Sequence, residues 1–509
     1  MRNYLVKFLY IFYSMTSLIH YFHRQKKEIN TVARTNSKIK WKRKVSSFLN
    51  MPSNVRSGVL TLLHTACGAG VLAMPFAFKP FGLMPGLITL TFCGICSLCG
   101  LLLQTRIAKY VPKSENASFA KLTQLINPSI SVVFDFAIAV KCFGVGVSYL
   151  IIVGDLVPQI VQSIFYRNDD NMSGSQEHHM FLDRRLYITL IMVFVISPLC
   201  FKRSLNSLRY ASMIAIISVA YLSGLIIYHF VNRHQLERGQ VYFMVPHGDS
   251  QSHSPLTTLP IFVFAYTCHH NMFSVINEQV DKSFKVIRRI PIFAIVLAYF
   301  LYIIIGGTGY MTFGENIVGN ILTLYPNSIS TTIGRLAMLL LVMLAFPLQC
   351  HPCRSSVKNI IIFIENFRKG KLYDNRASFI PLDNFNSEDP QEEPTQQNNE
   401  EPNLRSESLR HINIITLCIL LFSYLLAISI TSLAKVLAIV GATGSTSISF
   451  ILPGLFGYKL IGSEFMGTNE RVPTSIKIFK YLSLSLFIWG IAVMVASLSA
   501  IVFLGTSSH

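Results

Sequence analysis

The chain has 509 residues, of which 51% are hydrophobic and only 14% are charged. Charged residues make up about a quarter of an ordinary soluble domain, so this composition excludes one and indicates an all-α polytopic membrane protein. The formal net charge of +19 does not point to nucleic acid, because Lys and Arg gather in the N-terminal arm and in short connections between apolar stretches. We therefore expect the chain to contact a lipid membrane and no nucleic acid.

Residues 1–56 form a basic arm. An aromatic-rich stretch from Tyr4 to Phe22 precedes a run of Lys and Arg that contains a single acid, Glu28. Such a segment is attracted to anionic lipid, so we expect the arm to lie in the cytosol or on the membrane surface. The residues after Met51 also fit an internal start, in which case the arm is dispensable.

About eleven apolar stretches of the length that a bilayer requires follow the arm. They cover residues 57–78, 82–104, 130–153, 186–201, 210–231, 257–277, 291–313, 331–353, 411–433, 436–460 and 481–505. Basic residues are more frequent in alternate connections, which predicts a cytosolic arm and a lumenal C-terminus. The chain then divides into helices 1–5 (57–231), a lumenal loop (232–256), helices 6–8 with a cytosolic flank (257–371), a linker (372–410) and helices 9–11 (411–509).

Two glycosylation sequons and the linker carry further expectations. Asn171 lies in a predicted lumenal loop and is expected to be glycosylated, whereas Asn116 lies in a cytosolic loop and is expected to stay unmodified. The linker 372–410 is rich in Pro, Gln, Asn and acidic residues. This composition predicts a disordered cytosolic segment.

The first span is interrupted in its middle by Gly68, Gly70 and Pro75. In a helix interior Gly costs about 1 kcal/mol and Pro about 3 kcal/mol. Non-helical backbone at membrane depth is tolerated where it lines a cavity enclosed by protein, and interrupted helices form substrate sites in secondary transporters. A packing kink is the alternative, because both residue types are common in membrane helices.

The sixth span has a second interruption, where Thr267, His269, His270 and Asn271 crowd the middle of an apolar stretch. It lies five spans after the first. Two interrupted helices in corresponding positions of two halves indicate a transporter built from inverted repeats, with its substrate site near the midplane.

The two interruptions offer complementary partial charges. A half-helix that begins around Gly70 presents free N–H groups and a partial positive charge, which suits a carboxylate. Carbonyl groups released near Ala265 suit an ammonium group. The pattern therefore predicts an amino acid site, with the candidate substrate-binding residues Thr65, Gly68, Ala69, Gly70, Phe264, Ala265, Tyr266 and Thr267.

Ionisable side chains inside the spans are candidates for proton coupling, because each costs at least about 2.5–3.5 kcal/mol if it is unpaired. The candidates are His64, Lys141 and His269. Lys141 is an ionisable side chain in the middle of the third span, and the imidazole of the two histidines titrates near physiological pH. The alternative for each is a neutral core histidine or a lysine that snorkels, and we expect His270 to be a core histidine. Lys141 and His269 would also suit a second substrate carboxylate, which makes acidic amino acids one class to consider.

The cysteines do not indicate a disulfide framework, because all ten lie in or at the end of apolar stretches. Cys350, His351 and Cys353, together with His269 and His270, are the only support for a divalent-metal transporter. We expect no bound metal and no cofactor. No nucleophile and base spacing or metal-hydrolase motif is present, so we expect no enzymatic activity.

Five motifs in order resemble the amino acid/auxin permease family, and in particular its fungal vacuolar branch. They are Gly-Ala-Gly-Val-Leu-Ala-Met-Pro at 68–75 and the segments 144–158, 260–278, 309–314 and 346–354. The resemblance covers about residues 55–505 and implies the five-plus-five inverted-repeat fold of the bacterial leucine transporter, with substrate held by broken helices 1 and 6. Sodium-coupled members usually carry Asn where this chain has His64, which favours protons over sodium.

The sequence and the resemblance together predict a proton-coupled secondary transporter of amino acids in the vacuolar membrane. It would work by alternating access and export amino acids from the vacuole to the cytosol. One alternative is an amino acid receptor that signals through the arm or the linker with little flux. A divalent-metal transporter is the third candidate.

Overall fold

A computed structural model of the chain describes residues 53–112, 116–126, 130–165, 183–201, 211–232, 236, 238–246, 254–368, 402–465 and 473–504. The described residues after Arg56 belong to one compact unit, which contains the helices considered below apart from the first four residues of the helix Ser53–Ala66. Asn171, almost all of the basic arm and most of the predicted linker lie outside the described residues, so the expectations for them stay predictions.

The described residues form helices and no strands, which confirms the predicted all-α fold. Nine helical runs are long and apolar enough to cross a membrane, or ten if one bent pair is counted as a span. The nine are Leu83–Tyr110, Ile130–Phe165, Arg184–Phe201, Met213–Val231, Phe284–Asn316, Ile329–Arg368, Arg410–Ser429, Leu433–Phe465 and Ile476–Phe503. The predicted sixth span, 257–277, is not among them because it is present as two shorter helices.

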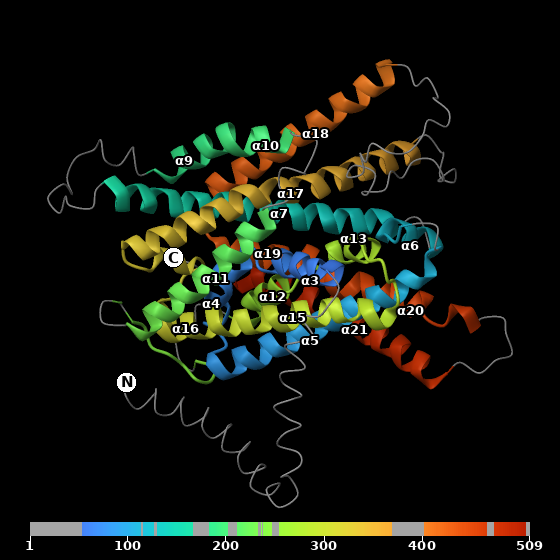
Figure 1. Cartoon of the computed structure of the whole chain (residues 1–509), viewed down its shortest axis with the longest axis horizontal. Coiled ribbons are helices and arrows are strands. Elements are labelled where there is room, and N and C mark those ends of the chain that lie inside the picture. Colours follow the sequence, from blue (N-terminus) through green and yellow to red (C-terminus); the bar gives the residue numbers. More distant parts are fainter. Residues whose placement is uncertain are drawn as a thin grey trace, which may run out of the picture. The chain divides into compact units, whose positions relative to one another are not determined.

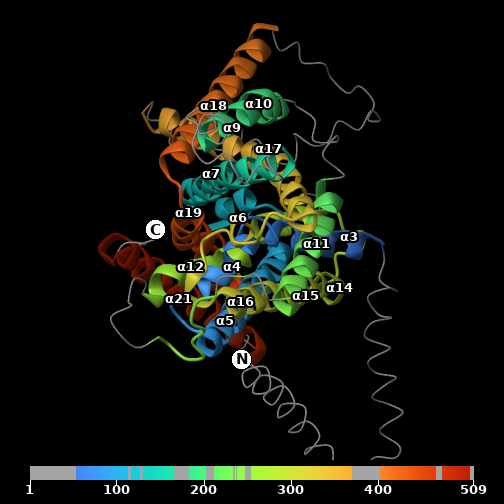
Figure 2. The same ribbon diagram turned by 90° about the vertical axis from the view of Figure 1, so that its left-hand side faces the viewer.

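The longest helix pair in the described residues consists of α7 (Ile130–Phe165) and α17 (Ile329–Arg368), which pack along each other. On one flank of this pair lie α9 (Arg184–Ile191), α10 (Ser197–Phe201) and α18 (Pro402–Ser429), as Figures 1 and 2 show. On its other side lie the interrupted helices and then α5 (Leu83–Ile107), α15 (Arg289–Tyr302), α16 (Thr308–Phe313) and α21 (Thr474–Leu504).

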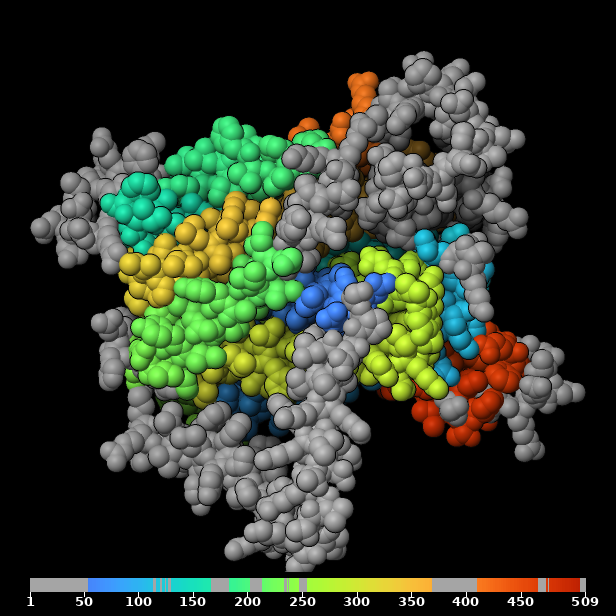
Figure 3. All heavy atoms as spheres, viewed as in Figure 1, coloured from blue at the N-terminus to red at the C-terminus, as the bar shows by residue number. Residues whose placement is uncertain are grey.

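The interrupted helices are α3 (Ser53–Ala66) with α4 (Gly70–Ala77), and α12 (Pro255–Ala265) with α13 (Met272–Asn277). Every residue of α4 is buried, and so is α12 from Thr257 to Ala265. Figure 3 shows α3 reaching the surface between α11 (Ala211–Val231) and the segment from α13 to α15. The half-helices that follow Gly70 and precede Tyr266 are therefore enclosed by protein.

The predicted linker 372–410 is helical at its end, because α18 begins at Pro402. Proline is well suited to the first position of a helix, where its missing N–H has no intrahelical partner to lose. The composition of the segment signalled disorder without resolving this helix start.

The segment 238–246, part of the predicted lumenal loop, is bound to two helix ends. Its backbone makes hydrogen bonds with Leu83 and Met84 at the start of α5 and with Phe313 and Glu315 at the end of α16. Gly314 lies at the second contact with φ of 57°, and a Cβ there would overlap the carbonyl group of Gln240. The loop is thus fixed across the ends of these helices.

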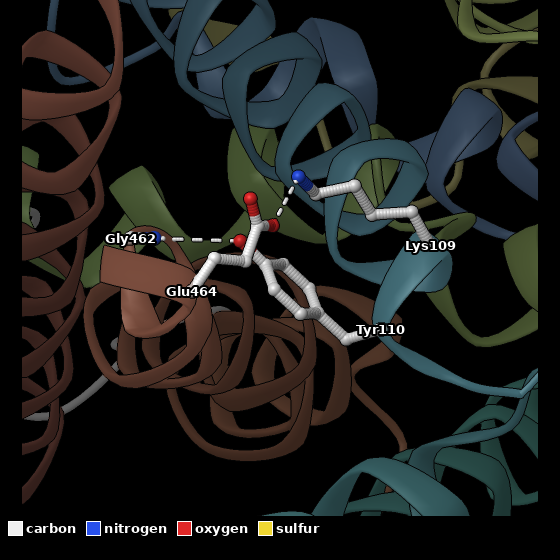
Figure 4. Close-up of polar contacts among 4 residues, drawn as sticks. All are labelled: Lys109, Tyr110, Gly462 and Glu464. Atoms are coloured by element: carbon white, nitrogen blue, oxygen red, sulfur yellow. Dashed lines mark hydrogen bonds and ion pairs between the residues drawn. The ribbon is translucent and has the colours of Figure 1, made fainter. Parts of the chain in front are cut away.

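The other end of α5 is joined to the turn after α20 (Leu452–Leu460). Lys109 Nζ lies 2.6 Å from Glu464 Oε1, and the N–H of Gly462 donates to the hydroxyl of Tyr110 at 3.3 Å (Figure 4). Both charged side chains are nearly half exposed, so the ion pair contributes at most about 1 kcal/mol. The contact sets the position of the turn more than it stabilises the fold.

Arg335 of α17 is a cation that the sequence analysis did not consider. It is 1% exposed and donates to the carbonyl groups of Leu322 and Tyr325 and to Oδ1 of Asn327. The planar guanidinium has five N–H donors in a fixed fork, so it suits several acceptors from one loop. Arg335 therefore holds the segment that leads into α17.

Gly314→Ala is expected to destabilise the protein by about 1–3 kcal/mol, because an L-residue is strained at this φ and its Cβ would overlap Gln240. Thermal unfolding of the purified protein in detergent measures the effect. The control is Gly224→Ala in α11, where nothing lies within 4 Å of the added Cβ, and its melting temperature should equal or exceed that of the wild type. Equal melting of both variants and the wild type would contradict this account.

Candidate functional site

The first interruption lies between α3 and α4, which are bent by 58° relative to each other. The N–H of Gly68 donates a hydrogen bond to the carbonyl of Ala66 at 2.9 Å, and the N–H of Val71 donates to the carbonyl of Gly68 at 3.2 Å. No described residue accepts a hydrogen bond from the N–H of Ala69 or Gly70. Free N–H groups at the start of α4 are the arrangement that binds a carboxylate.

Small residues at this turn allow neighbouring helices to approach closely. A Cβ on Gly68 would stand 3.2 Å from the hydroxyl oxygen of Tyr149 in α7, and a Cβ on Gly70 would stand 3.0 Å from Cδ1 of Phe264 in α12. Gly70 and Phe264, both predicted to bind substrate, are therefore in contact. The two interruptions lie side by side.

The second interruption consists of Tyr266, Thr267 and Cys268, followed by the 3₁₀ turn η4 (His269–Asn271) and α13. The carbonyl of Phe264 accepts from the N–H of Thr267 at 3.0 Å. The carbonyl of Tyr266 accepts from the N–H of Cys268 and from Ser97 Oγ of α5, at 3.0 and 3.1 Å. Two of the predicted acceptor carbonyls thus already have partners within the protein.

Tyr302 of α15 connects the two interruptions. Its hydroxyl oxygen lies 3.0 Å from the carbonyl oxygen of Ala66 and 2.6 Å from that of Ala265, and the side chain is fully buried. These carbonyls are the last ones of α3 and α12, respectively. The sequence analysis missed Tyr302, although a tyrosine within the apolar seventh span is a signal, because a buried hydroxyl needs a partner.

The three residues of η4 contact three different helices. His269 Nε2 lies 3.0 Å from the carbonyl oxygen of Ser97 in α5, and Asn271 Nδ2 donates to Thr65 Oγ1 of α3 at 2.8 Å. His270 Nε2 lies 3.2 Å from Lys141 Nζ of α7. Because a 3₁₀ helix has three residues per turn, consecutive side chains point in directions about 120° apart.

Lys141 is 3% exposed, and its Nζ also donates to Oε1 of Gln349 in α17 at 3.2 Å. Its two polar neighbours are a neutral amide and an imidazole, and no carboxylate of the described residues forms an ion pair with it. The sequence analysis assigned His270 to the core, whereas the structure brings it to Lys141.

The predicted proton-coupling residues His64 and His269 lie in the last turn of α3 and in η4.

The metal-transporter alternative has no support in the part of the chain that the structure describes. The described residues contain no group of three or more His, Cys, Asp or Glu side chains that could hold a metal ion. His351 Nδ1 accepts instead from Arg354 at 2.7 Å, and Cys353 Sγ donates to the carbonyl of Ala139 at 3.6 Å. All ten cysteines are free, as the sequence led us to expect.

Two adjacent helix interruptions enclosed by a bundle of membrane-length helices are the arrangement of the leucine-transporter fold. The crystal structure of MhsT in complex with L-phenylalanine has this fold with a TM-score of 0.53 and 12% sequence identity, over 86% of this chain and 98% of that chain. Residues 51–496 match the family described as transmembrane amino acid transporter protein, and the chain belongs to this family. It is thus a transporter and not an enzyme.

Two relatives from Saccharomyces cerevisiae are similar over most of their length. One is named vacuolar amino acid transporter 5 and is 99% identical over 459 residues, which cover 90% of this chain and all of that protein. The other is named vacuolar amino acid transporter 6 and is 53% identical, over 88% of this chain and 99% of that protein. The resemblance inferred from the five motifs is confirmed.

Gly70→Ala is expected to lower amino acid flux by about tenfold or more. Its Cβ would stand 3.0 Å from the ring of Phe264 and 3.4 Å from Cα of Ala265, and overpacking of this kind costs about 1–3 kcal/mol. Flux per molecule of transporter in the membrane is the measurement. Gly307→Ala, where nothing lies within 4 Å of the new Cβ, is the control. If the two variants transport equally well, the close approach of α4 to α12 is not needed.

Proposed function

We propose that the chain is a proton-coupled secondary transporter that moves amino acids across the vacuolar membrane by alternating access. Membership of the family supports amino acids as substrates, and the names of the two yeast relatives support the vacuolar membrane. The observation that carries the proposal is the pair of adjacent interruptions, one with free N–H groups and both with carbonyl groups at the hydroxyl of Tyr302.

The substrate carboxylate binds at the start of α4, in the segment Gly68 to Gly70. The N–H groups of Ala69 and Gly70 have no acceptor among the described residues, and the positive end of the α4 dipole favours an anion. The amino group binds near the end of α12, in the segment Phe264 to Thr267. Carbonyl oxygens have two lone pairs, so those that already accept one hydrogen bond retain capacity for an ammonium group.

The proton binds at one of three bases, the buried Lys141 and His269 or the half-buried His64. The contact of 3.2 Å between Lys141 Nζ and His270 Nε2 favours Lys141, because two bases so close together in a poorly solvated interior repel each other when both are charged. The pair therefore takes up one proton more readily than two. A proton on this pair changes the contact between Lys141 and His270, and His270 is part of η4 in the second interruption.

The direction of transport follows from the gradient, because a carrier has no direction of its own. In an acidic vacuole, protons leave the lumen down their gradient. If proton and amino acid move together, amino acids are exported to the cytosol, as the sequence analysis predicted.

Flux in isolated vacuolar membrane vesicles, with and without the chain, tests the proposal. A panel of labelled amino acids is followed first with ATP-driven acidification and then with the proton gradient collapsed. We expect efflux of one class of amino acid that needs both the chain and the gradient. Amino acid binding without chain-dependent flux would favour a receptor, and flux that ignores the gradient would refute proton coupling.

Lys141→Met is expected to reduce gradient-driven efflux to the level that remains when the gradient is collapsed. The substitution keeps an unbranched side chain of similar length but removes the proton-binding amine. Exchange of labelled for unlabelled amino acid at equal pH on both sides should persist. The control is Lys459→Met at the exposed end of α20, which should behave like the wild type. Retention of full gradient-driven efflux in Lys141→Met would remove this lysine from the coupling mechanism.

A further inference from the structure

The contacts of Tyr302 leave hydrogen-bond acceptors in excess at the junction of the two interruptions. Three oxygen atoms meet there: the hydroxyl oxygen of Tyr302 and the carbonyl oxygens of Ala66 and Ala265. A hydroxyl has one proton and so can donate to only one carbonyl at a time. The N–H of Gly68 gives the Ala66 carbonyl a donor at 2.9 Å. The thiol of Cys67 is a donor to the Tyr302 hydroxyl oxygen at 4.0 Å, but an S–H group donates only weakly.

The surplus matters because the junction is enclosed. Tyr302, Ala265 and Tyr266 are all fully buried, and Ala66 is 5% exposed. When Tyr302 donates to Ala265 at the shorter distance of 2.6 Å, its oxygen and that of Ala66 face each other at 3.0 Å without a shared proton. Two acceptors in contact at low dielectric are unfavourable unless a donor joins them. An ammonium group, with three N–H donors and a positive charge, is suited to this place.

Tyr302 is well placed to fix this geometry because it does not belong to either interrupted helix. It ends α15, and a π-helical turn, η5 (Ile303–Gly307), follows it directly. Its ring packs edge to face on the ring of Tyr266, with centroids 5.1 Å apart. The last carbonyl groups of α3 and α12 thus both lie at the hydroxyl of a residue that a third helix holds in place.

We propose that Tyr302 is a positioning residue for the amino group of the substrate. Its hydroxyl keeps the carbonyl groups of Ala66 and Ala265 close together, and the ammonium group of the amino acid supplies charged donors that are stronger than the Cys67 thiol. This inference rests on the proposed amino acid transport. It adds to that proposal a residue outside both interrupted helices and one specific contact, that of the amino group.

Tyr302→Phe tests the inference, because it keeps the ring and removes only the hydroxyl. Two competitors of flux are compared: the transported amino acid and its deaminated analogue, the same acid without the amino group. In the wild type, the amino acid should inhibit far more strongly than the analogue. In Tyr302→Phe we expect the ratio of the two inhibition constants to fall by about tenfold, the usual effect of losing a hydrogen bond to a charged group. The inhibition constant of the analogue itself should change little.

The matched control is Tyr299→Phe. Tyr299 belongs to the same helix, and its hydroxyl makes a hydrogen bond of 3.0 Å with Thr91 Oγ1 of α5 and not with a carbonyl of either interruption. Both inhibition constants should stay as in the wild type. If Tyr302→Phe does not accumulate in the membrane, Tyr302→His takes its place. Its ring N–H can donate to one carbonyl, as the hydroxyl does, but that nitrogen offers no acceptor to the ammonium group. The ratio should therefore fall, and an unchanged ratio would overturn the inference.

Three further outcomes of these experiments would also decide whether the inference holds. Equal weakening of both competitors in Tyr302→Phe would mean that the tyrosine only supports the fold, which overturns the inference. An unchanged ratio together with flux that is lost when sodium and potassium are replaced by N-methylglucamine would assign the three oxygens to a metal cation, which also overturns it. If the wild type neither transports nor binds any amino acid, the proposed function fails first, so the two failures are distinguishable.

Discussion

The constraint on which this structure depends is the need to satisfy backbone polar groups where there is no water. Each interruption frees N–H and C=O groups at membrane depth, and an unpaired group there costs several kcal/mol. The protein pairs most of them with side chains from other helices. The hydroxyl of Tyr302 lies within hydrogen-bond distance of the carbonyls of Ala66 and Ala265 and donates to one of them at a time, and Ser97 donates to the carbonyl of Tyr266. What stays free, notably the N–H groups of Ala69 and Gly70, defines the candidate site.

Two buried cations differ in how fully the described residues compensate their charge. Arg335 donates to two carbonyl groups and one amide oxygen of a single loop. All three of its guanidinium nitrogens make hydrogen bonds there, so a role in supporting that loop accounts for its burial. Among the described residues, the hydrogen-bond partners of Lys141 Nζ are one imidazole and one amide. A charged ammonium in that setting is poorly compensated, so its protonation is free to respond to conditions, which is the property that proton coupling requires.

The first interruption was predictable from the sequence because Gly68 and Gly70 weaken a helix whatever their neighbours are, although Pro75 lies inside α4 and does not end it. The second was predictable because polar residues crowd the middle of an apolar stretch. The same holds for the spans, which follow from apolar length. The partners were not predictable: Tyr302 is a tyrosine in an apolar stretch, and His270 looks no different from His269 beside it. Which helix each side chain meets depends on the packing of segments far apart in sequence. The helix start at Pro402 was missed for another reason, since overall composition outweighed the local signal.

The turn η4 gives a physical reason why substrate and proton sites should influence each other. Its three consecutive residues contact α5 at Ser97, α7 at Lys141 and α3 at Thr65, over distances of 3.0, 3.2 and 2.8 Å. Because these residues share one turn of backbone, a rotation that moves Asn271 with α3 also moves His270 relative to Lys141. Protonation of the Lys141 and His270 pair would in turn favour one position of the turn. Coupling of this kind needs no long pathway, because the backbone proposed to bind the amino acid and the base proposed to bind the proton are neighbours.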